Sequence, residues 1–398
     1  MEIKNKYFIT DEKIGEGASS EVLIGKEIST GELVAIKKIN ILEQVNSKKN
    51  KSYEKIIKNI ENEISIMKQL DHPNILKYYD SEIINDIYYI VIEYCNLGTL
   101  KNVIEYNKKN LNSSKNELRR EQNTRYLLNQ LKDAICYLAD KNFIHRDIKP
   151  MNILLKNNMK NGNDFYDVAN IEVKLGDFGL ARYYENNVDN LLDTICGSPL
   201  YMSPELINGK KYNFTTELWS FGIIMYELLH GFHPFNSNTL MELKSNLYNN
   251  INSRLDKSYT SQCIDLLEKL LNQNPNNRIV NNELLFHDWF SINLTTLKNN
   301  AITIPTNIPH NRRNIIYFPS NSLDTSFNLS KMKMNKINFR NYPRKNKPKY
   351  PISNPEELLI KKIDYSPILQ NKKEIVIDKH LDNDNINNSN DIFNFDID

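Results

Sequence analysis

Short apolar runs follow one another through the N-terminal part of the chain. Between residues 7 and 39, β-rich runs at 22–24 and 33–36 are separated by a Ser-Thr-Gly turn signal at 29–31. Such runs, bounded by turn residues, predict strands. Residues 87–94 form a run that is apolar apart from Glu93, and such a run predicts a buried strand. The N-terminal part is therefore predicted to be rich in β-structure.

Helical spacing of apolar residues dominates further along the chain. Residues 53–70 predict a helix whose apolar face is formed by Ile56, Ile60, Met67 and Leu70. The polar residues 46–51 before it predict a loop, and the proline at position 73 ends the helix. Residues 122–140 predict another helix. The most apolar stretch, 218–232, is too short to span a bilayer and predicts a buried core helix.

The character of the chain changes after residue 290. Residues 291–398 are rich in Asn, Lys and Pro and have only weak periodicity, which predicts a low-complexity, mostly disordered tail. Within it, residues 331–350 are basic with interleaved aromatic residues, a composition that can bind nucleic acid or a membrane surface. The favoured interpretation of this segment is a solvated tail without such a contact.

Composition narrows the class of protein. A chain of 398 residues that is 40% hydrophobic can bury a large core, and its net charge of +2 indicates no general affinity for nucleic acids or membranes. The four cysteines form no CxxC pair, which favours reduced thiols over a structural zinc site. The N-terminus carries no apolar signal segment. We therefore expect an intracellular, cytoplasmic protein without a transmembrane segment.

Two short motifs carry the chemistry. The first, His-Arg-Asp-Ile-Lys-Pro-Met-Asn at 145–152, supplies the carboxylate of Asp147, which can orient a hydroxyl nucleophile, and the amide oxygen of Asn152, which can hold a metal. The second, Asp-Phe-Gly at 177–179, supplies the carboxylate of Asp177, which can hold Mg²⁺ on ATP. These groups are the parts that phosphoryl transfer needs.

A glycine-rich run lies upstream, between two predicted strands. Residues 15–22 read Gly-Glu-Gly-Ala-Ser-Ser-Glu-Val, and such glycines let backbone N–H groups approach phosphates. Alone, the run is equally compatible with an ordinary hairpin turn, because Ser20 replaces the third glycine of the usual pattern. The Val-Ala-Ile-Lys run at 34–37 follows at the expected place, and the two together indicate nucleotide binding.

Glu63 lies inside the apolar face of the predicted helix 53–70. A carboxylate placed there is costly unless it is paired. The position therefore predicts a buried partner, and the alternative is a boundary residue that reaches solvent.

Taken together, these motifs resemble eukaryotic-type serine/threonine protein kinases over residues 7–290. The resemblance implies an α+β, two-lobed protein kinase fold: a small antiparallel-sheet lobe with helix C at 7–94, a larger helical lobe at 95–290, and the low-complexity C-terminal tail. It also implies transfer of the γ-phosphoryl group of ATP, with Mg²⁺, to Ser or Thr hydroxyls of protein substrates.

The resemblance also implies roles for individual residues. Asp147 would be the base that orients the hydroxyl, Lys149 would neutralise the transferred group, and Asn152 and Asp177 would hold metal. Lys37 would contact phosphates and pair with Glu63. The residues implied in nucleotide binding are Ile14, Gly15, Glu16, Gly17, Ala18, Ser19, Ser20, Glu21, Val22, Ala35, Lys37, Glu63, Glu93, Cys95 and Leu154. Structural roles are implied for His145, packed near Phe178, and for a buried Glu205–Arg278 ion pair.

Regulation and substrate preference follow from the same resemblance. Thr194 stands where the family often carries an activating phosphate, and Arg146 and Arg182 stand where that phosphate is bound. Thr99 and Met151 occupy positions at which kinases that select Arg at substrate position −3 typically carry Glu. We therefore expect no such preference here.

The branch of the family is indicated by short runs only. Residues 94–98 and 196–202 and the long polar insert 157–170 look like the ULK-type, autophagy-initiating kinases. The tail shows no match to the partner-binding region of that branch. One further departure is Glu217, which stands where the family usually has Asp as the acceptor for the catalytic loop.

Three functions are open at this stage. An active Ser/Thr kinase is favoured because every residue named above for catalysis and metal binding is present. A catalytically weak pseudokinase that acts as a scaffold is the second hypothesis, left open by Glu217 and Ser20. An interaction protein that works through its tail is the third, and no positive motif supports it.

Overall fold

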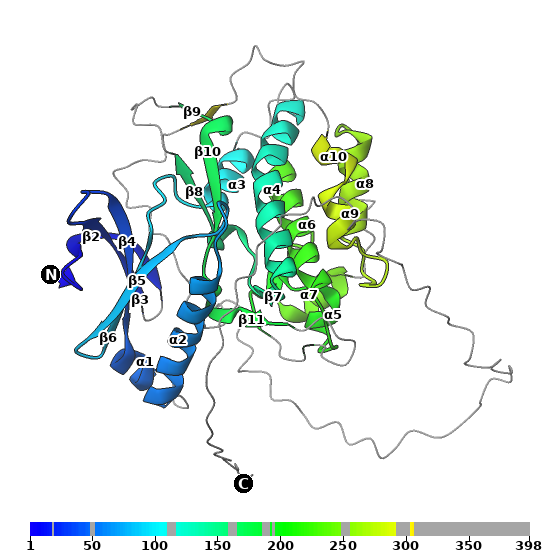
Figure 1. Ribbon diagram of the computed structural model, residues 1–398. Coiled ribbons are helices and arrows are strands. Elements are labelled where there is room, and N and C mark those ends of the chain that lie inside the picture. Colours follow the sequence, from blue (N-terminus) through cyan, green and yellow to red (C-terminus); the bar gives the residue numbers. More distant parts are fainter. Residues whose placement is uncertain are drawn as a thin grey trace, which may run out of the picture. The chain divides into compact units, whose positions relative to one another are not determined.

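Two lobes make up the described part of the chain in the computed structural model, one built on an antiparallel sheet and the other on helices (Figure 1). All of these residues lie in one compact unit, 1–333. The structure describes residues 1–17, 20–47, 52–109, 117–157, 165–184, 192, 196–247, 255–291 and 303–305.

The smaller lobe is a six-stranded antiparallel sheet in the order β1-β2-β3-β4-β6-β5. Its strands are β1 (Glu2–Ile3), β2 (Tyr7–Gly17), β3 (Ser20–Glu27), β4 (Leu33–Asn40), β5 (Tyr78–Ile84) and β6 (Ile87–Glu93). The strands predicted within residues 7–39 and at 87–94 are confirmed. The short β1, which pairs with the start of β2, precedes the residues for which strands were predicted.

The two faces of this sheet enter different cores, because successive residues of a strand point to opposite sides. Val22 and Ala35 lie in the main core, which continues into the helical lobe. Ile36, the neighbour of Ala35 in β4, lies in a separate cluster on the other face. Val22 is directly opposite Lys37 in the β3–β4 pairing, so Lys37 points to the same face as Val22.

Two helices complete this lobe. The predicted helix is confirmed as α2 (Tyr53–Gln69), whose N-terminus is capped by the Ser52 side chain. The predicted loop from residue 46 is wrong at its start, because α1 (Ile41–Ser47) runs through residue 47. The Asn40 side chain accepts a hydrogen bond from the first turn of α1. A seven-residue helix is too short for a clear periodic signal. The rest of the predicted loop lies outside the described residues.

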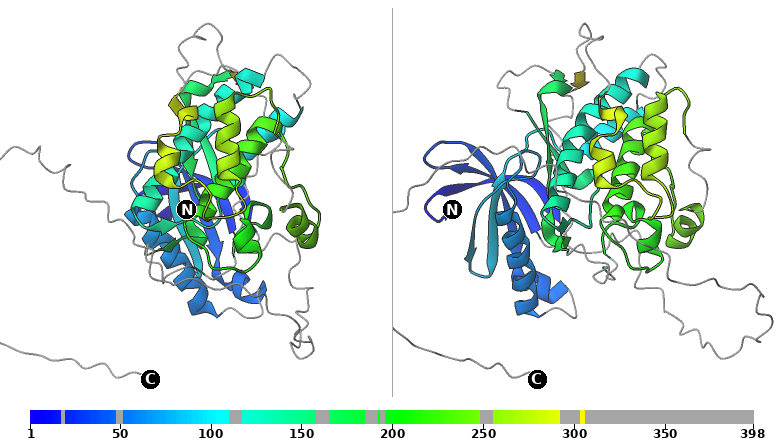
Figure 2. Two further views of the ribbon diagram at one scale, coloured as in Figure 1. Left: turned by 90° about the vertical axis from the view of Figure 1, so that its right-hand side faces the viewer. Right: turned by 45° about the vertical axis from the view of Figure 1, so that its right-hand side comes forward.

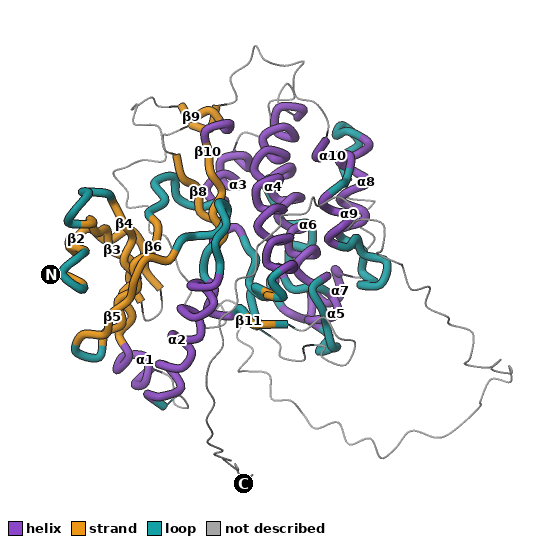
Figure 3. The backbone as a smooth tube through the Cα atoms, viewed as in Figure 1, coloured by secondary structure: helices purple, strands orange, loops and turns teal. Residues whose placement is uncertain are grey.

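The larger lobe is built around α6 (Thr215–His230), in which every residue from Thr216 to His230 is buried. This confirms the predicted core helix. The predicted helix 122–140 is confirmed as the C-terminal part of α4. The other helices surround these two (Figures 2 and 3). They are α3 (Leu100–Lys109), α5 (Pro204–Ile207), α7 (Leu240–Leu247), α8 (Ser261–Leu270), α9 (Asn281–Leu285) and α10 (Asp288–Ser291), and α4 itself spans Glu117–Asp140.

Three antiparallel pairs of short strands accompany the helices. They are β8 (Ile153–Asn157) with β10 (Ile171–Leu175), β7 (Phe143–Ile144) with β11 (Arg182–Tyr183), and β9 (Phe165–Asp167) with β12 (Thr303–Pro305). The prediction of a mostly disordered tail is wrong at residues 303–305. These residues form β12, which pairs with β9 in the polar insert. The basic segment 331–350 lies outside the described residues, so its predicted interactions stay predictions. Within the described part, no helix is both long and apolar enough to cross a membrane.

Candidate active site

The loop that carries Asp147 is anchored at its first residue. His145 is fully buried; its Nε2 lies 2.9 Å from the Gly176 carbonyl oxygen, and its ring lies 5.0 Å from the Phe178 ring. The predicted contact with Phe178 is therefore present. Burial lowers the pKa of His145 to about 4, opposed by the Gly176 hydrogen bond. The imidazole is neutral at pH 7 and serves as a structural group.

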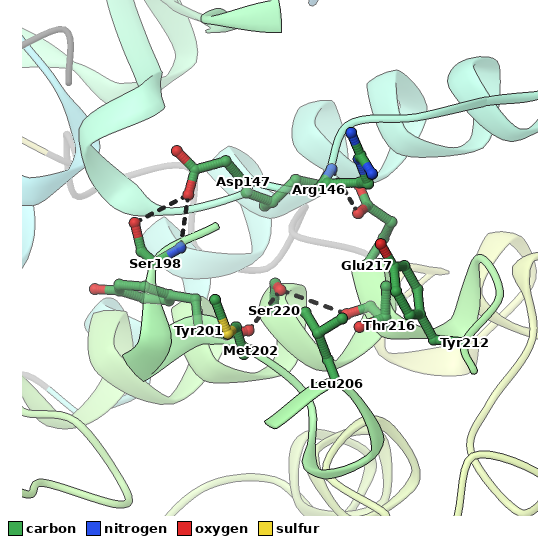
Figure 4. Close-up of a pocket in the computed structure, with 11 residues that line it drawn as sticks. Arg146, Asp147, Ser198, Tyr201, Met202, Leu206, Tyr212, Thr216, Glu217 and Ser220 are labelled. Atoms are coloured by element: carbon green, nitrogen blue, oxygen red, sulfur yellow. Dashed lines mark hydrogen bonds between the residues drawn. The ribbon is translucent and has the colours of Figure 1, made fainter. Parts of the chain in front are cut away.

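Glu217, from the first turn of α6, accepts two backbone hydrogen bonds from the same loop. Arg146 N donates to its Oε1 at 2.9 Å and His145 N donates to its Oε2 at 3.3 Å. Burial raises the pKa of Glu217 to about 7, against the lowering effect of the two N–H groups. Arg146 has a φ of 67°, a conformation that a non-glycine residue adopts only when its surroundings hold it. Glu217 thus provides the acceptor that the family usually draws from Asp (Figure 4).

The Asp147 carboxylate is surrounded by hydrogen-bond donors. Lys149 Nζ lies 2.7 Å and Asn152 Nδ2 3.1 Å from its Oδ2. Ser198 donates to its Oδ1 from the backbone N at 3.0 Å and from Oγ at 2.9 Å (Figure 4). Lys149 Nζ also donates to Ser198 Oγ at 2.8 Å. The donors fix the orientation of the carboxylate, which is the geometry a hydroxyl-orienting base requires.

Ser198 was not among the residues predicted to take part in the site. The residue approaches Asp147 because Gly197 precedes it with a φ of 102°, and a Cβ at Gly197 would collide with the Arg146 carbonyl oxygen. A serine directly after a glycine that must adopt positive φ was the available signal. Without tertiary contacts, that signal does not show which loop the serine meets.

Asn152 and Asp177 are brought to the same end of the β8–β10 ribbon. Asn152 directly precedes β8, Asp177 follows β10 by two residues, and Ile153 is paired with Leu175. The side chain of Asn152 donates its amide group to Asp147, while its buried Oδ1 has no hydrogen-bond partner among the described residues. Burial raises the pKa of Asp177 to about 6, with Lys37 opposing the shift.

These two groups fit Mg²⁺. The unpartnered amide oxygen and the neighbouring carboxylate are hard oxygen ligands, and Mg²⁺ is commonly held by one or two protein ligands together with substrate phosphates and water. In the described residues, no group of three or more His, Cys, Asp or Glu side chains could hold a metal. The arrangement therefore suits a metal that arrives with a nucleotide.

Glu63 has the buried partner that its position in the helix predicted, and this partner is Lys37, as the kinase resemblance implied. Lys37 Nζ lies 2.7 Å from Glu63 Oε1 and 3.8 Å from Asp177 Oδ1, and all three side chains are about nine-tenths buried. Burial by itself would lower the pKa of Lys37, but the two carboxylates outweigh burial and raise it. The ammonium group is therefore charged and points toward the proposed metal ligands.

Several side chains predicted to contact the nucleotide belong to one hydrophobic core. The main core includes Val22, Ala35, Cys95 and Leu154, with Ile14 packed against it. The two glutamates of the glycine-rich run are not part of this core. The Glu16 side chain forms an ion pair with Lys13, and the Glu21 side chain forms one with Lys38. The predicted nucleotide contact of these glutamates can therefore come only from their backbone. Ala18 and Ser19 lie outside the described residues.

The predicted regulatory residues are described only in part. Thr194 lies outside the described residues. Arg146 Nε donates to the Leu180 carbonyl oxygen at 2.8 Å, and Arg182 donates to the Ala181 carbonyl oxygen at 2.7 Å. Burial, and next the charge of Arg146, lower the pKa of Arg182. Neither guanidinium forms an ion pair with a carboxylate of the described chain, so both keep capacity for an anion.

A pocket lies between the catalytic loop, the segment 198–206 and α6, and Asp147 is one of the residues that line it (Figure 4). Its wall includes the apolar side chains of Met202 and Leu206. Leu206 directly follows Glu205, which forms a bidentate ion pair with Arg278 at 2.7 and 2.9 Å. The Arg278 guanidinium lies 5.2 Å from the Trp219 ring. The predicted structural ion pair is therefore present.

Comparisons with known proteins agree with this geometry. Residues 8–290 match the protein kinase domain. The chain is 46% identical over 298 residues to a putative serine/threonine-protein kinase, R517/R518, of Acanthamoeba polyphaga mimivirus, covering 73% of this chain and 64% of the relative. It is 33% identical to the serine/threonine-protein kinase atg1 of Dictyostelium discoideum, covering 72% of this chain and 39% of the relative.

The similarity is not confined to one branch. The probable serine/threonine-protein kinase nek3 of Dictyostelium discoideum is also 33% identical, over 68% of this chain and 22% of the relative. The chain thus spans less than two thirds of the length of each of these relatives. Protein kinases in general use ATP and Mg²⁺. With the matched domain covering most of the sequence, the chain belongs to the protein kinase family.

Proposed function

We propose that this chain is an active serine/threonine protein kinase, which transfers the γ-phosphoryl group of ATP to Ser or Thr hydroxyls of protein substrates. The observation that carries the proposal is the position of Asp147. Its carboxylate is oriented by Lys149, Asn152 and Ser198, and Asn152 also presents a free oxygen on the metal side. A hydroxyl acceptor and a metal–phosphate complex can therefore meet at one place.

Each charged residue has a task in this reaction. Asn152 and Asp177 would hold Mg²⁺, which stabilises negative charge on the phosphates when it is bound. Lys37, held by Glu63, would contact the α- and β-phosphates. Asp147 would accept the hydrogen bond of the substrate hydroxyl and orient its oxygen for attack. Lys149 would stabilise the negative charge on the γ-phosphoryl group as this group moves from the ADP oxygen to the substrate hydroxyl oxygen.

A pseudokinase is the alternative, and the two features that kept it open have physical answers. Glu217 accepts both backbone hydrogen bonds, so the loop has its anchor. Ser20 replaces a glycine at the start of β3, where it pairs with Gly17 in a regular strand register. Neither substitution removes a group that the chemistry needs.

The test is phosphotransfer by purified protein with labelled ATP, Mg²⁺ and a generic protein substrate. Asp147→Asn and Asp177→Ala should each lower kcat by roughly 10²–10⁴-fold or more, because general base catalysis and metal binding each contribute at least that much. Asp133→Asn, which changes a solvent-exposed carboxylate on α4, serves as the matched control and should keep full activity. Turnover near the wild-type rate in either site variant would contradict the assignment.

We further propose that phosphorylation of Thr194 activates the enzyme. Thr194 precedes Glu205 by eleven residues, and Arg146 and Arg182 both lack a carboxylate partner in the described chain. A phosphate of about −1.5 to −2 charge would gain charge-assisted hydrogen bonds from both guanidiniums. Mass spectrometry of active enzyme should find phosphate on Thr194, and Thr194→Ala should be less active. An unmodified Thr194 together with a fully active alanine variant would contradict this proposal.

We place the kinase in the cytoplasm. The four cysteines are free, three of them buried, which suits a reducing compartment. Fluorescence microscopy of the tagged full chain tests this location, and a signal confined to secretory compartments would contradict it.

A further inference from the structure

A buried cluster of one carboxylate and two ammonium groups lies beside the proposed nucleotide site. Lys156 Nζ lies 2.7 Å and Lys174 Nζ lies 3.1 Å from Glu93 Oε1. The backbone N of Lys77 donates to Glu93 Oε2 at 3.4 Å. Only 6% of Glu93 and 7% of Lys174 is exposed to solvent. These side chains have no role in the proposed phosphoryl transfer, although Glu93 and Lys174 are buried and burying charges is costly. The Lys156 side chain is partly exposed.

The two lysines belong to the β8–β10 ribbon, and the proposed metal ligands Asn152 and Asp177 lie just beyond one end of this ribbon. Lys156 is on β8 and Lys174 is on β10, and Lys174 is paired with Leu154 in the β8–β10 register. Lys156 and Leu154 are two residues apart on one strand, so these three side chains share one face of the ribbon. The face that carries Leu154, predicted to contact the nucleotide, therefore also holds the Glu93 carboxylate.

Glu93 is the last residue of β6 and the first residue of the hinge, the segment 93–98 that connects the two lobes. The C-terminal half of the hinge is bound to the ribbon by backbone and amide groups. Leu97 N donates to the Leu155 carbonyl oxygen at 3.0 Å, and Leu155 N donates to the Gly98 carbonyl oxygen at 2.9 Å. Asn96 Nδ2 donates to the Asn157 carbonyl oxygen at 3.0 Å. The ion pairs of Glu93 provide the corresponding attachment at the N-terminal end.

Residues 94 and 95 therefore lie between two attachments to the same ribbon. By the kinase resemblance, the backbone of residues 93–95 is implied in contact with the adenine of the nucleotide. The other ends of the two ribbon strands lead to Asn152 and Asp177. The ion pairs of Glu93 thus connect the adenine-binding backbone with the groups proposed to hold the metal, through a hydrogen-bonded ribbon of five residue pairs.

The charges of the cluster are consistent with a permanent ion pair. Burial by itself would raise the pKa of Glu93, but the hydrogen bond from Lys156 and the charge of Lys174 lower it below its ordinary value. The pKa of Lys156 is raised by Glu93, against the effect of burial. On its other side Lys174 lies 3.2 Å from Glu172, which is 40% exposed. Glu93 and Glu172 thus contact the same lysine from the buried and the solvent side.

We propose that the Glu93 side chain is a positioning residue for ATP: its ion pairs with Lys156 and Lys174 hold the hinge at the place where adenine and the metal-bound phosphates can be contacted together. This inference rests on the proposed function. In the observed arrangement the ion pairs of Glu93 and the Lys37–Glu63 ion pair are both formed. Preorganisation of this kind lowers the cost of binding a ligand that spans both parts of the site.

The test compares two ligands that differ in how much of the site they use. Adenosine reaches only the hinge part, whereas ADP with Mg²⁺ reaches both. Their dissociation constants are measured by isothermal titration calorimetry on the full chain, without turnover. Glu93→Gln should weaken binding of ADP with Mg²⁺ by about fivefold or more relative to adenosine, the lower end of the range for coupled sites. In the kinase assay, KM for ATP should rise more than kcat falls.

Two further variants complete the design. Glu172→Gln removes the solvent-side partner of Lys174 and should leave the ratio of the two dissociation constants within about twofold, inside the spread expected for a surface ion pair. Lys156→Gln leaves Lys174 to neutralise Glu93, so the fold should persist, and the ratio should shift in the same direction as in Glu93→Gln. If Glu93→Gln does not fold, Lys156→Gln decides the question.

The outcomes separate this inference from the proposed function. An unchanged ratio in folded Glu93→Gln or in Lys156→Gln, or tighter binding of ADP with Mg²⁺, would overturn the positioning role. Failure of the wild-type chain to bind ADP with Mg²⁺ at all would instead contradict the proposed kinase activity. A lower thermal unfolding temperature with an unchanged ratio would assign Glu93 to stability alone, which also overturns the inference.

Discussion

Replacing Glu217 should reduce catalysis far more than it reduces stability. Glu217→Ala removes the acceptor of the His145 and Arg146 N–H groups, and each unsatisfied buried donor costs about 1–3 kcal/mol. The same change also removes a costly buried carboxylate. The rise of its pKa from 4.5 to about 7 corresponds to about 3 kcal/mol at pH 8. These two effects have opposite sign, so the free energy of unfolding should fall by only about 0–3 kcal/mol.

For kcat, no second effect opposes the loss of the Glu217 carboxylate. Arg146 keeps its φ of 67° only while the loop is held, and Asp147 follows it directly. A displacement of about 1 Å at a reacting group can cost roughly 10²-fold in rate. Glu217→Ala should therefore lower kcat by about 10- to 100-fold, whereas Glu217→Asp, which keeps a carboxylate, should stay within a few-fold of wild type. Steady-state kinetics beside urea unfolding measure both quantities. Equal kcat in the wild-type enzyme and in both variants would refute the reasoning.

The same carboxylate predicts a pH dependence of stability. Because the pKa of Glu217 is higher in the folded than in the unfolded chain, the folded state binds more protons between about pH 4.5 and 7. Its contribution to the free energy of unfolding therefore falls as the pH rises through this window. Glu217→Gln, which cannot titrate, should show a flatter decrease. Identical pH profiles for the two proteins would exclude a raised pKa at this position.

Two further predictions concern the Glu205–Arg278 ion pair and the selection of peptide substrates. Arg278→Met should lower the free energy of unfolding by about 3–5 kcal/mol, because it leaves the buried Glu205 carboxylate unpaired, and the double variant with Glu205→Leu should recover much of the loss in urea titrations; no recovery would contradict the ion-pair explanation. A positional-scanning peptide array should show no selection for Arg at −3. Neither Thr99, whose hydroxyl donates to Asn102, nor Met151 can pair with a guanidinium, and strong selection for Arg would require another carboxylate.

The sequence predicted those parts of the site that depend on local pattern. The apolar face of helix 53–70 showed that Glu63 needed a buried partner, and the structure places Lys37 Nζ at 2.7 Å. The glycine-rich run, the Asp147 loop and the Asp177 motif each follow from residue types at short spacing. Strands, the core helix α6 and the two lobes were also predictable, because alternation and helical periodicity are properties of consecutive residues.

Local pattern failed where pairing joins distant parts of the chain. The strand β12 lies in a tail of low complexity and exists only through its pairing with β9. The short helix α1 carries too few residues for a periodic signal. Ser198 reaches Asp147 across 51 positions of sequence, and Lys156 reaches Glu93 across 63. The residues between the two partners carry no local pattern that predicts either contact.

By itself, then, the sequence determined the family and predicted the chemistry and the residues proposed to carry it, because phosphoryl transfer requires specific groups in short, recognisable runs. Tertiary structure alone decided how those groups are oriented. The β8–β10 register brings Asn152 and Asp177 together, α6 delivers Glu217 to the catalytic loop, and the ribbon places two lysines against Glu93. Each of these arrangements depends on which distant segments pack side by side, and burial then makes unpaired charges too costly for any other arrangement.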